Sequence, residues 1–413
     1  MSELNVGDLN VGSELNLPLY PESGLPSDPP LGHMVFNTTK GKISVWDGSN
    51  WISIGSSKYD IQPGGSNYTT TDLSGDYAGY RVIKFTGGGS FTINNAPDDQ
   101  GIEFLLIGGG GGGGGVIGGG GGAGGVIYKR DVYLPAGVYN VSIGSGGIGG
   151  VGWNNSGQEG TAGVPSTITG GNIFYEALGG GGGSAHGGNS PGAGAGKGGS
   201  GGGSASADRK GGQATGVLCG NIDLHLKTDH AMNQPGSFKS EENNTVVGRS
   251  SHFNAPENGI YKNSAHDNPA PNLLKGWQGY PGGDFGGGDE GAGGGGAGQC
   301  GENAGQPGNQ GGDGGHGIYC EIEGSKIAYA GGGGGGVRGT SRNRGLGGVG
   351  GGGHGGNNSV ASINYPQTTS NAAQNGKDNT GGGGGGGGYN GSSTSVIGAT
   401  GGSGVLIIRY KYT

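Results

Sequence analysis

FLLIGGGGGGGGVIGGGGGAGGVIY, residues 104–128, is the stretch that decides how this chain folds. An apolar, strand-like run enters eight consecutive glycines, leaves them at Val116 and Ile117, and then enters a second glycine block. Glycine supplies 116 of the 413 residues, which is about four times its ordinary share. The first question is whether these glycines form a flexible spacer or the fold itself.

The glycine blocks recur along the chain, and strand-like runs such as FYEAL and KIAYA lead directly into them. The longest blocks contain almost no serine or charge, which flexible, solvated linkers usually include. This pattern favours ordered glycine over a spacer. The blocks are residues 108–115, 118–125, 179–183, 293–296, 331–336, 350–353 and 381–388.

Ordered glycine must be stabilised through its backbone, because it has no side chain to bury. Fixing a backbone costs about 1–2 kcal/mol per residue, and glycine lies at the costly end. Hydrogen bonds at about 0.5–1.5 kcal/mol and Cα–H contacts at about 0.5–1 kcal/mol can offset this only if nearly every glycine makes both. Extended helices with three residues per turn, packed without Cβ atoms, meet that condition. The lack of a G-X-Y period excludes collagen.

We therefore predict an all-β plus polyglycine-II fold with essentially no α-helix, since no helical period with caps occurs. A β-sandwich is expected to clamp a bundle of packed polyglycine-II helices. The lattice positions chosen to represent this bundle are Gly108, Gly115, Gly121, Gly181, Gly333 and Gly384.

The domain organisation follows from changes in pattern. Residues 1–20 predict an extended N-terminal arm, and residues 21–55 a small β-hairpin attachment module built from MVF, KISVW and WISI. The polar residues 56–79 predict a linker. Residues 80–413 predict the glycine-rich β-sandwich and polyglycine-II domain, with an insertion at 204–280 that contains few glycines.

Composition excludes several classes of function. The net charge is −8 and the basic residues are scattered, so no nucleic-acid footprint is present. No signal peptide or long apolar run occurs, so we expect no membrane insertion. Three widely spaced cysteines, Cys219, Cys300 and Cys320, predict free thiols in a reducing compartment.

Motifs that suggest catalysis lack their structural context. The G-x-S-x-G at residues 198–202 has no strand before it or helix after it, and GAGAGKGG at 192–199 has glycine where a phosphate-binding loop needs Ser or Thr. The adjacent pairs Asp98-Asp99 and Glu241-Glu242 would point to opposite faces of a strand, unlike the paired acids of glycosidases. We predict no enzyme activity and no cofactor.

Metal binding is also not predicted. The eight histidines are dispersed without zinc spacing, and His186, His316 and His354 lie in glycine-rich segments, where an imidazole can cap an edge of the lattice. Asp284, Asp289 and Glu290 could hold calcium with backbone oxygens, but a solvated loop is the favoured interpretation.

Several segments of the sequence together resemble a known protein family. EFLLIGGGGGGGG, GVIYKRDVYLPAGVYNVSIGSGG, KIAYAGGGGGGVRG and the terminal GGSGVLIIRY together resemble the glycine-rich domain of tailed-bacteriophage fibre and adhesin proteins over about residues 80–413. PPLGHMVFNTTKGKISVWDGSNWISI resembles a short β segment of phage virion proteins. The resemblance implies a structural role in which variable loops touch the host surface.

The function expected from the resemblance is that of a bacteriophage virion structural protein, a fibre or fibre-tip adhesin that attaches to a host glycan or protein. The alternative is a capsid decoration or head-fibre protein, and a polysaccharide depolymerase is a third possibility. We expect a homotrimer, made in the bacterial host cytoplasm and located in the virion, with other virion proteins bound through the N-terminal region.

Two sets of side chains are candidates for these contacts. Aromatic residues between glycine blocks suit glycan or protein surfaces, although covering the ends of the bundle explains them equally well. The receptor-binding candidates are Trp153, Phe253, Tyr261, Trp277, Tyr280, Tyr365 and Tyr389. The virion-attachment candidates are Leu4, Val6, Leu9, Val11, Leu15, Leu17, Trp46 and Trp51.

Overall fold

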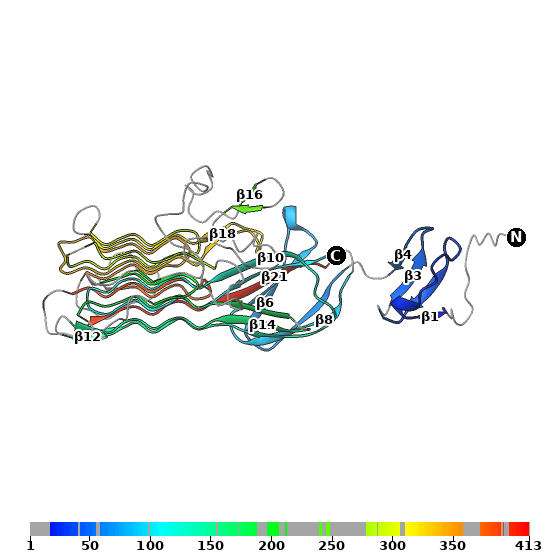
Figure 1. Cartoon of the computed structure of the whole chain (residues 1–413), viewed down its shortest axis with the longest axis horizontal. Coiled ribbons are helices and arrows are strands. Elements are labelled where there is room, and N and C mark those ends of the chain that lie inside the picture. The colour runs from blue at the N-terminus through cyan, green and yellow to red at the C-terminus, as the bar shows by residue number, and fades with distance from the viewer. Residues whose placement is uncertain are drawn as a thin grey trace. The chain divides into compact units, whose positions relative to one another are not determined.

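The computed structural model describes most of the chain (Figure 1). The described residues are 17–39, 42–54, 58–97, 100–153, 156–171, 173–187, 196–205, 211–212, 239–241, 245–247, 278–286, 288–305, 310–357, 372–389, 391 and 396–412. Contacts divide the chain into a small unit, residues 1–58 with 97–99, and a large unit, residues 59–96 with 100–413. The described residues form strands and two short 3-10 turns with no α-helix, so the all-β prediction is confirmed.

The small unit is a four-stranded sheet in the order β1-β2-β3-β4. Its strands are β1 (Leu19–Tyr20), β2 (Met34–Asn37), β3 (Lys42–Trp46) and β4 (Trp51–Ile54). The runs MVF, KISVW and WISI are thus strands as predicted. β1 is an addition, and it pairs in parallel with β2.

The large unit contains two five-stranded sheets that face each other. One has the order β10-β9-β21-β7-β6 and the other β15-β14-β11-β8-β5. The first comprises β6 (Tyr68–Asp72), β7 (Tyr80–Phe85), β9 (Ile102–Ile107), β10 (Val126–Val132) and β21 (Val405–Lys411). The second comprises β5 (Asp60–Gly64), β8 (Gly89–Asn95), β11 (Gly137–Ser142), β14 (Ser166–Gly170) and β15 (Ile173–Ala177).

Strands β9 and β21 are buried on both faces, which explains their unbroken apolar runs. Phe104 and Leu106 of β9 face the other sheet of the sandwich. Leu105 and Ile107 point the opposite way, into a second core shared with the hairpin of β18 (Ile318–Cys320) and β19 (Ile327–Tyr329). The hairpin therefore forms a third layer on the β9–β21 sheet.

The predicted linker at residues 56–79 is wrong where this segment forms β5 and β6. Each is the edge strand of its sheet. The backbone groups on its outer edge therefore need no neighbouring strand, and the side chains on its solvent face are polar. An edge also tolerates Pro63, which has no N–H to donate. The polar sequence and the internal Pro-Gly pair therefore gave no pattern from which these two strands could be predicted.

The glycine tracts run out from the sandwich as extended segments that lie side by side (Figure 1). Backbone N–H groups of residues 108–115 donate in rotation to three segments, 119–125, 158–164 and 399–402, at 2.8–3.0 Å. Each neighbour receives every third N–H group. This three-residue period is that of an extended helix with three residues per turn.

The carbonyl groups of the same tract accept from three other segments, residues 147–150, 180–183 and 384–387. The tract 108–115 therefore has six hydrogen-bonded neighbours. The tract 118–125 also has six, because it donates to three segments and accepts from three more. Those six are residues 108–114, 178–184, 200–203, 292–295, 333–336 and 381–387.

Glycine content follows the position of a segment in this lattice. Tracts with neighbours all round are nearly pure glycine. On the surface, residues 145–151 read SGGIGGV, and the exposed residues are Ser145, Ile148 and Val151, three apart. Residues 157–164 keep glycine at every third position only. Larger side chains are therefore found where a segment has no neighbour, and the non-glycine residues buried inside the lattice, such as Ala123 and Ala292, are small.

The six representative lattice glycines fit this account. A Cβ atom built on five of them would lie 1.9–2.2 Å from a backbone carbonyl oxygen of a neighbouring segment, a distance that real Cβ atoms essentially never show, and at Gly115 the nearest such oxygen is at a tight 3.0 Å. For Gly384 that oxygen belongs to Ala399, and for Gly121 to Gly111. Because backbone rather than a flexible side chain blocks the space, relief requires a shift of the lattice.

We predict that Gly384→Ala lowers the free energy of unfolding by about 1–3 kcal/mol, as overpacking does, and that Gly384→Val lowers it further. Gly88→Ala is the matched control, because the nearest atom to its new Cβ is 3.7 Å away. Thermal melts of the three variants test this. Equal melting temperatures for Gly384→Val and the parent chain would contradict a packed lattice.

Candidate functional site

The end of the glycine bundle farther from the sandwich gathers loops from distant parts of the sequence, and we call it the distal end. The tract 108–115 turns there at Val116 and Ile117, with Ile117 in the left-handed region at φ 47°. These two side chains pack with Tyr389 and Val396 in a small buried cluster. Strands β12 (Val151–Trp153), β13 (Ser156–Gly157) and β20 (Val396–Ile397) form a short sheet at this end (Figure 1).

A charged cluster lies at the distal end between two loops. Arg342 Nη1 donates to Glu290 Oε1 at 2.6 Å, and Asp289 pairs with Arg338 at 3.4 Å and with Arg342 at 3.5 Å. The Arg338 guanidinium lies over the Tyr389 ring, 5.3 Å from its centroid. Glu290 is 2% exposed, and burial raises the pKa of its carboxyl while Arg342 lowers it in part. The cluster fixes the two loops against each other.

These pairs leave little room for the calcium interpretation. Asp289 and Glu290 face arginines, and Asp284 Oδ1 accepts from the Gly211 N–H at 2.8 Å. Within the described ranges, no group of three or more His, Cys, Asp or Glu side chains is arranged to hold a metal ion.

The receptor-binding candidates divide into three groups. Tyr280 and Tyr389 are 4% and 6% exposed, so they cover the bundle and do not offer an exposed ring. Trp153 lies in β12 at the distal end. Phe253, Tyr261, Trp277 and Tyr365 fall outside the described residues.

The virion-attachment candidates also fall into three groups. Trp46 and Trp51 pack against each other with ring centroids 5.7 Å apart, and Trp51 Nε1 donates to the Pro26 carbonyl at 2.9 Å. Their rings therefore hold the small unit together. Leu17 is half-buried. Leu4, Val6, Leu9, Val11 and Leu15 fall outside the described residues.

The insertion at 204–280 is tied to the bundle where it begins and where it ends. The Ala205 N–H donates to Ser184 Oγ at 2.8 Å. At the other end, Gln278 accepts from the N–H groups of Val126 and Leu178 and donates through Nε2 to the Glu176 carbonyl. Between them the structure describes residues 211–212 and the hairpin of β16 (Lys239–Glu241) and β17 (Thr245–Val247). The rest of the insertion lies outside the described residues.

Side chains cap the open edges of the lattice, and they repeat with the three-residue period. Asn375 and Asp378 accept from the backbone N–H groups of Thr400 and Ser403. Thr161 Oγ1 accepts from the Ile148 N–H at 2.7 Å. Each cap satisfies a donor that would otherwise face outward. An uncapped row of donors can recruit another chain, as the edge of a β-sheet does.

Two of the predicted edge histidines cap one segment, residues 345–350. His354 Nδ1 accepts from the Gly347 N–H at 2.8 Å, and His316 Nδ1 accepts from the Val349 N–H at 3.1 Å. Asp313 Oδ1 caps Leu346 of the same segment. Burial lowers the pKa of both imidazoles, and Asp313 opposes that shift. Only a neutral imidazole can accept at Nδ1.

We predict that acid weakens this edge. An unfolded histidine titrates near pH 6.5, and the folded pKa values of His316 and His354 lie lower. The unfolded chain thus binds more protons, and the stability contributed by the neutral caps falls as pH drops from about 6.5 through the folded pKa values. Amide exchange at Gly347 and Val349 should accelerate over this range.

His354→Gln is the matched variant, because a side-chain amide oxygen can accept the same N–H without titrating. In this variant the acid effect at Gly347 should disappear while that at Val349 persists. Exchange that is independent of pH, after correction for the intrinsic rate, would contradict the capping role.

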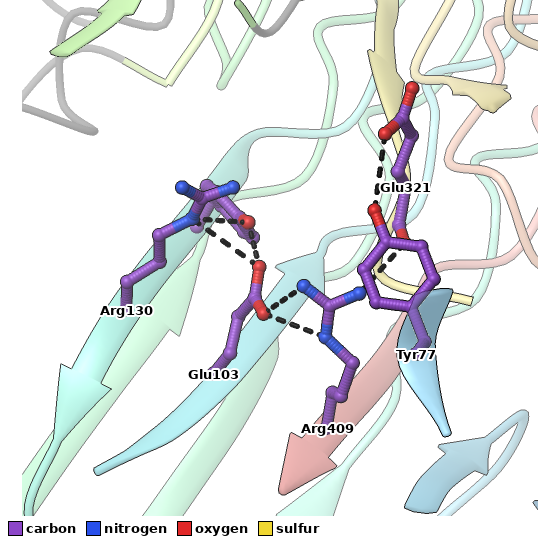
Figure 2. A network of polar contacts seen from close by, with 6 residues as sticks. Tyr77, Glu103, Arg130, Glu321 and Arg409 are labelled. Atoms are coloured by element: carbon purple, nitrogen blue, oxygen red, sulfur yellow. Dashed lines mark hydrogen bonds and ion pairs between the residues drawn. The ribbon is translucent and has the colours of Figure 1, made fainter. Parts of the chain in front are cut away.

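A second polar network lies where the β18–β19 layer meets the sandwich (Figure 2). Arg409 on β21 pairs with Glu103 on β9 and also donates through Nη1 to the Glu321 carbonyl at 3.0 Å. Its guanidinium stacks over the Tyr77 ring at 4.7 Å, and the Tyr77 hydroxyl reaches Glu321. Arg130 and the Tyr128 hydroxyl occupy the other side of Glu103.

This network holds the layers together. Glu103 is shared by two arginines and a tyrosine, so its oxygens have partners on both sides. Lys84 and Tyr329 similarly hold Glu323. No local sequence pattern indicates this network, because its members lie up to 306 residues apart.

We predict that Arg409→Ala lowers the free energy of unfolding by about 3–5 kcal/mol, because it leaves the nearly buried Glu103 without its main partner. Arg81→Ala is the matched control: its pair with Asp72 is solvent-accessible on both sides, and such pairs contribute about 0–1 kcal/mol. Denaturant titrations compare the two. Similar losses would contradict a structural role for the Figure 2 network.

The prediction of three free thiols is wrong for Cys300, which is disulfide-bonded. Cys320 is free and buried in the second core. Burial raises the pKa of its thiol to about 12, so it stays protonated and unreactive at neutral pH. Cys219 lies outside the described residues.

Comparison with known proteins supports the glycine-rich domain. A protein family described as a glycine-rich domain matches residues 85–264, which include the sandwich strands from β8 to β15 and the first tracts of the bundle. No curated protein matches the chain. Within the described part, no helix is long and apolar enough to cross a membrane.

Proposed function

We propose that this chain is a bacteriophage virion structural protein that acts as a fibre or fibre-tip adhesin and binds a glycan or protein on the host surface. The observation on which the proposal depends is the distal end, where loops far apart in the sequence are fixed on a block of hydrogen-bonded backbone. Loops on a rigid scaffold are the usual place for recognition.

Rigidity matters for this role because an ordered platform lowers the entropy lost on binding. Each inner tract is hydrogen-bonded to six others, so the distal loops cannot move independently at their bases. The Glu290–Arg342 pair and the Val116 cluster fix two of these bases further. Sequence can then vary in the loops without altering the scaffold.

The insertion at 204–280 is the second element that supports adhesion. Its ends are bound to the lattice through Ala205 and Gln278, so its sequence can change without disturbing the tracts. Loops of this length are uncommon unless they are functional or disordered. We propose that the insertion contributes to the receptor-binding surface, and that the small unit attaches the chain to other virion proteins.

We predict that the purified full chain reduces adsorption of the parent phage to its host cells in a dose-dependent manner. Replacing residues 221–276 with a short Gly-Ser linker, which leaves Cys219 in place, should keep the melting temperature and abolish the competition. The two-part readout separates loss of binding from loss of folding.

The control for this experiment is Leu346→Ser, an exposed position at 52% on the side of the bundle, which should compete as well as the parent chain. Failure of the intact chain to compete at saturating concentration would contradict the adhesin proposal. Antibody labelling of phage heads instead of tails would favour capsid decoration.

A further inference from the structure

Three cysteines occur in the chain, and the structure accounts for the state of two of them. Cys300 is disulfide-bonded, whereas Cys320 is free and buried. The third, Cys219, lies outside the described residues. A disulfide within one chain joins two of its own cysteines, so elimination leaves Cys219 as the partner of Cys300.

Exchange with Cys320 does not disturb this pairing in the folded chain. The Cys320 side chain is 3% exposed, in the core that Ile318 and Tyr329 share with β9 and β21. Burial raises the pKa of its thiol to about 12, and thiol–disulfide exchange requires an accessible thiolate. Cys320 therefore cannot attack the disulfide of Cys300.

The backbone on both sides of Cys300 is fixed in the lattice. The Gly296 N–H donates to the Gln299 carbonyl at 2.9 Å, and the Gly301 N–H donates to the Pro281 carbonyl at 3.0 Å. Cys300 itself is half-buried. A bond to this residue therefore ties its partner to the hydrogen-bonded backbone of the bundle.

We propose that Cys219 and Cys300 form a disulfide that anchors the insertion at 204–280 to the bundle. The hydrogen bonds of Ala205 and Gln278 hold the two ends of the insertion, and the disulfide adds an anchor between them. It divides the insertion into two shorter loops, which restricts the conformations open to each. This inference does not depend on the adhesin proposal.

A low-molecular-weight disulfide such as oxidised glutathione supplies the oxidant for this bond. The thiolate of one cysteine attacks it, which forms a mixed disulfide and releases one glutathione thiolate. The thiolate of the other cysteine then attacks the protein sulfur of the mixed disulfide and releases the second. The two cysteine thiols lose two electrons and two protons, and one glutathione disulfide becomes two thiols. Because a cytosol keeps thiols reduced, the bond forms after the chain has left it.

Disulfide mapping of the full chain, kept in oxidised glutathione, tests the pairing. The protein is denatured with N-ethylmaleimide present, which alkylates free thiols, and is then digested without reductant. Mass spectrometry should find a peptide pair that joins Cys219 to Cys300, and alkylation at Cys320 alone. Alkylation of Cys219 or Cys300, or a bond between the Cys219 residues of two copies, would overturn the proposal.

A site-specific protease measures whether the bond restrains the insertion. With a recognition sequence inserted after Ser250, the native chain is cut, and the denatured fragments should stay joined until dithiothreitol separates them. Cys219→Ala should release the fragments without reductant and raise the rate of native cleavage several-fold, because the anchor is lost. Cys320→Ala is the matched control: it removes a thiol that forms no disulfide, so its fragments should stay joined. Equal cleavage rates in the two variants would overturn the anchoring role.

Discussion

The whole structure depends on backbone amides that bond in three directions within a volume that excludes Cβ atoms. A glycine tract with three residues per hydrogen-bonding period presents its N–H groups to three neighbours in turn and receives three more from the other side. In a β-sheet each strand has only two such neighbours. The additional neighbours compensate for the conformational entropy that glycine loses, which no buried side chain could offset. A single methyl group at an inner position such as Gly384 would meet a carbonyl oxygen.

A lattice of this kind has no natural boundary, so the rest of the molecule must supply one. At one end the tracts continue into β9, β10 and β21, whose apolar side chains form two cores. At the distal end, Val116, Ile117, Tyr389 and Val396 close the turn. Along the sides, residues such as His354, Asn375 and Asp378 accept outward-facing N–H groups. Side chains of the bundle therefore lie mainly at its borders. There they have room for a Cβ atom, and they accept from N–H groups that have no neighbouring segment.

The sandwich and the bundle are joined through layers, not through a single interface. Because β9 and β21 are buried on both faces, they belong to two cores at once. The β18–β19 hairpin is fixed over them by Arg409, which bonds both Glu103 and the Glu321 carbonyl (Figure 2), and by Lys84, which pairs with Glu323. Ion pairs of this kind are costly to break once buried. The strands from which the tracts emerge are therefore held on both sides, and the first glycines of each tract begin from fixed positions.

Much of this fold could be predicted from the sequence, because the patterns concerned are local. Unbroken glycine without serine or charge indicated ordered backbone, the apolar run FLLI indicated a strand, and MVF, KISVW and WISI indicated the strands of the small unit. The role of His316 and His354 as caps of the lattice edge also followed from their glycine-rich surroundings. Each of these patterns can be recognised within a few neighbouring residues of the sequence.

Only the tertiary structure decided the rest, because it depends on contacts between distant segments. The edge strands β5 and β6 are polar and contain Pro63, and only their places in the two sheets make them strands. The sequence left Tyr280 and Tyr389 equally open to recognition and to covering the bundle, and their burial against the lattice decides for the second. Glu103 and Arg409 meet across 306 residues, and no local pattern records such a pair. The sequence by itself determined that glycine would be ordered, and tertiary packing determined which segments adjoin, since a tract of identical residues contains no information about its neighbours.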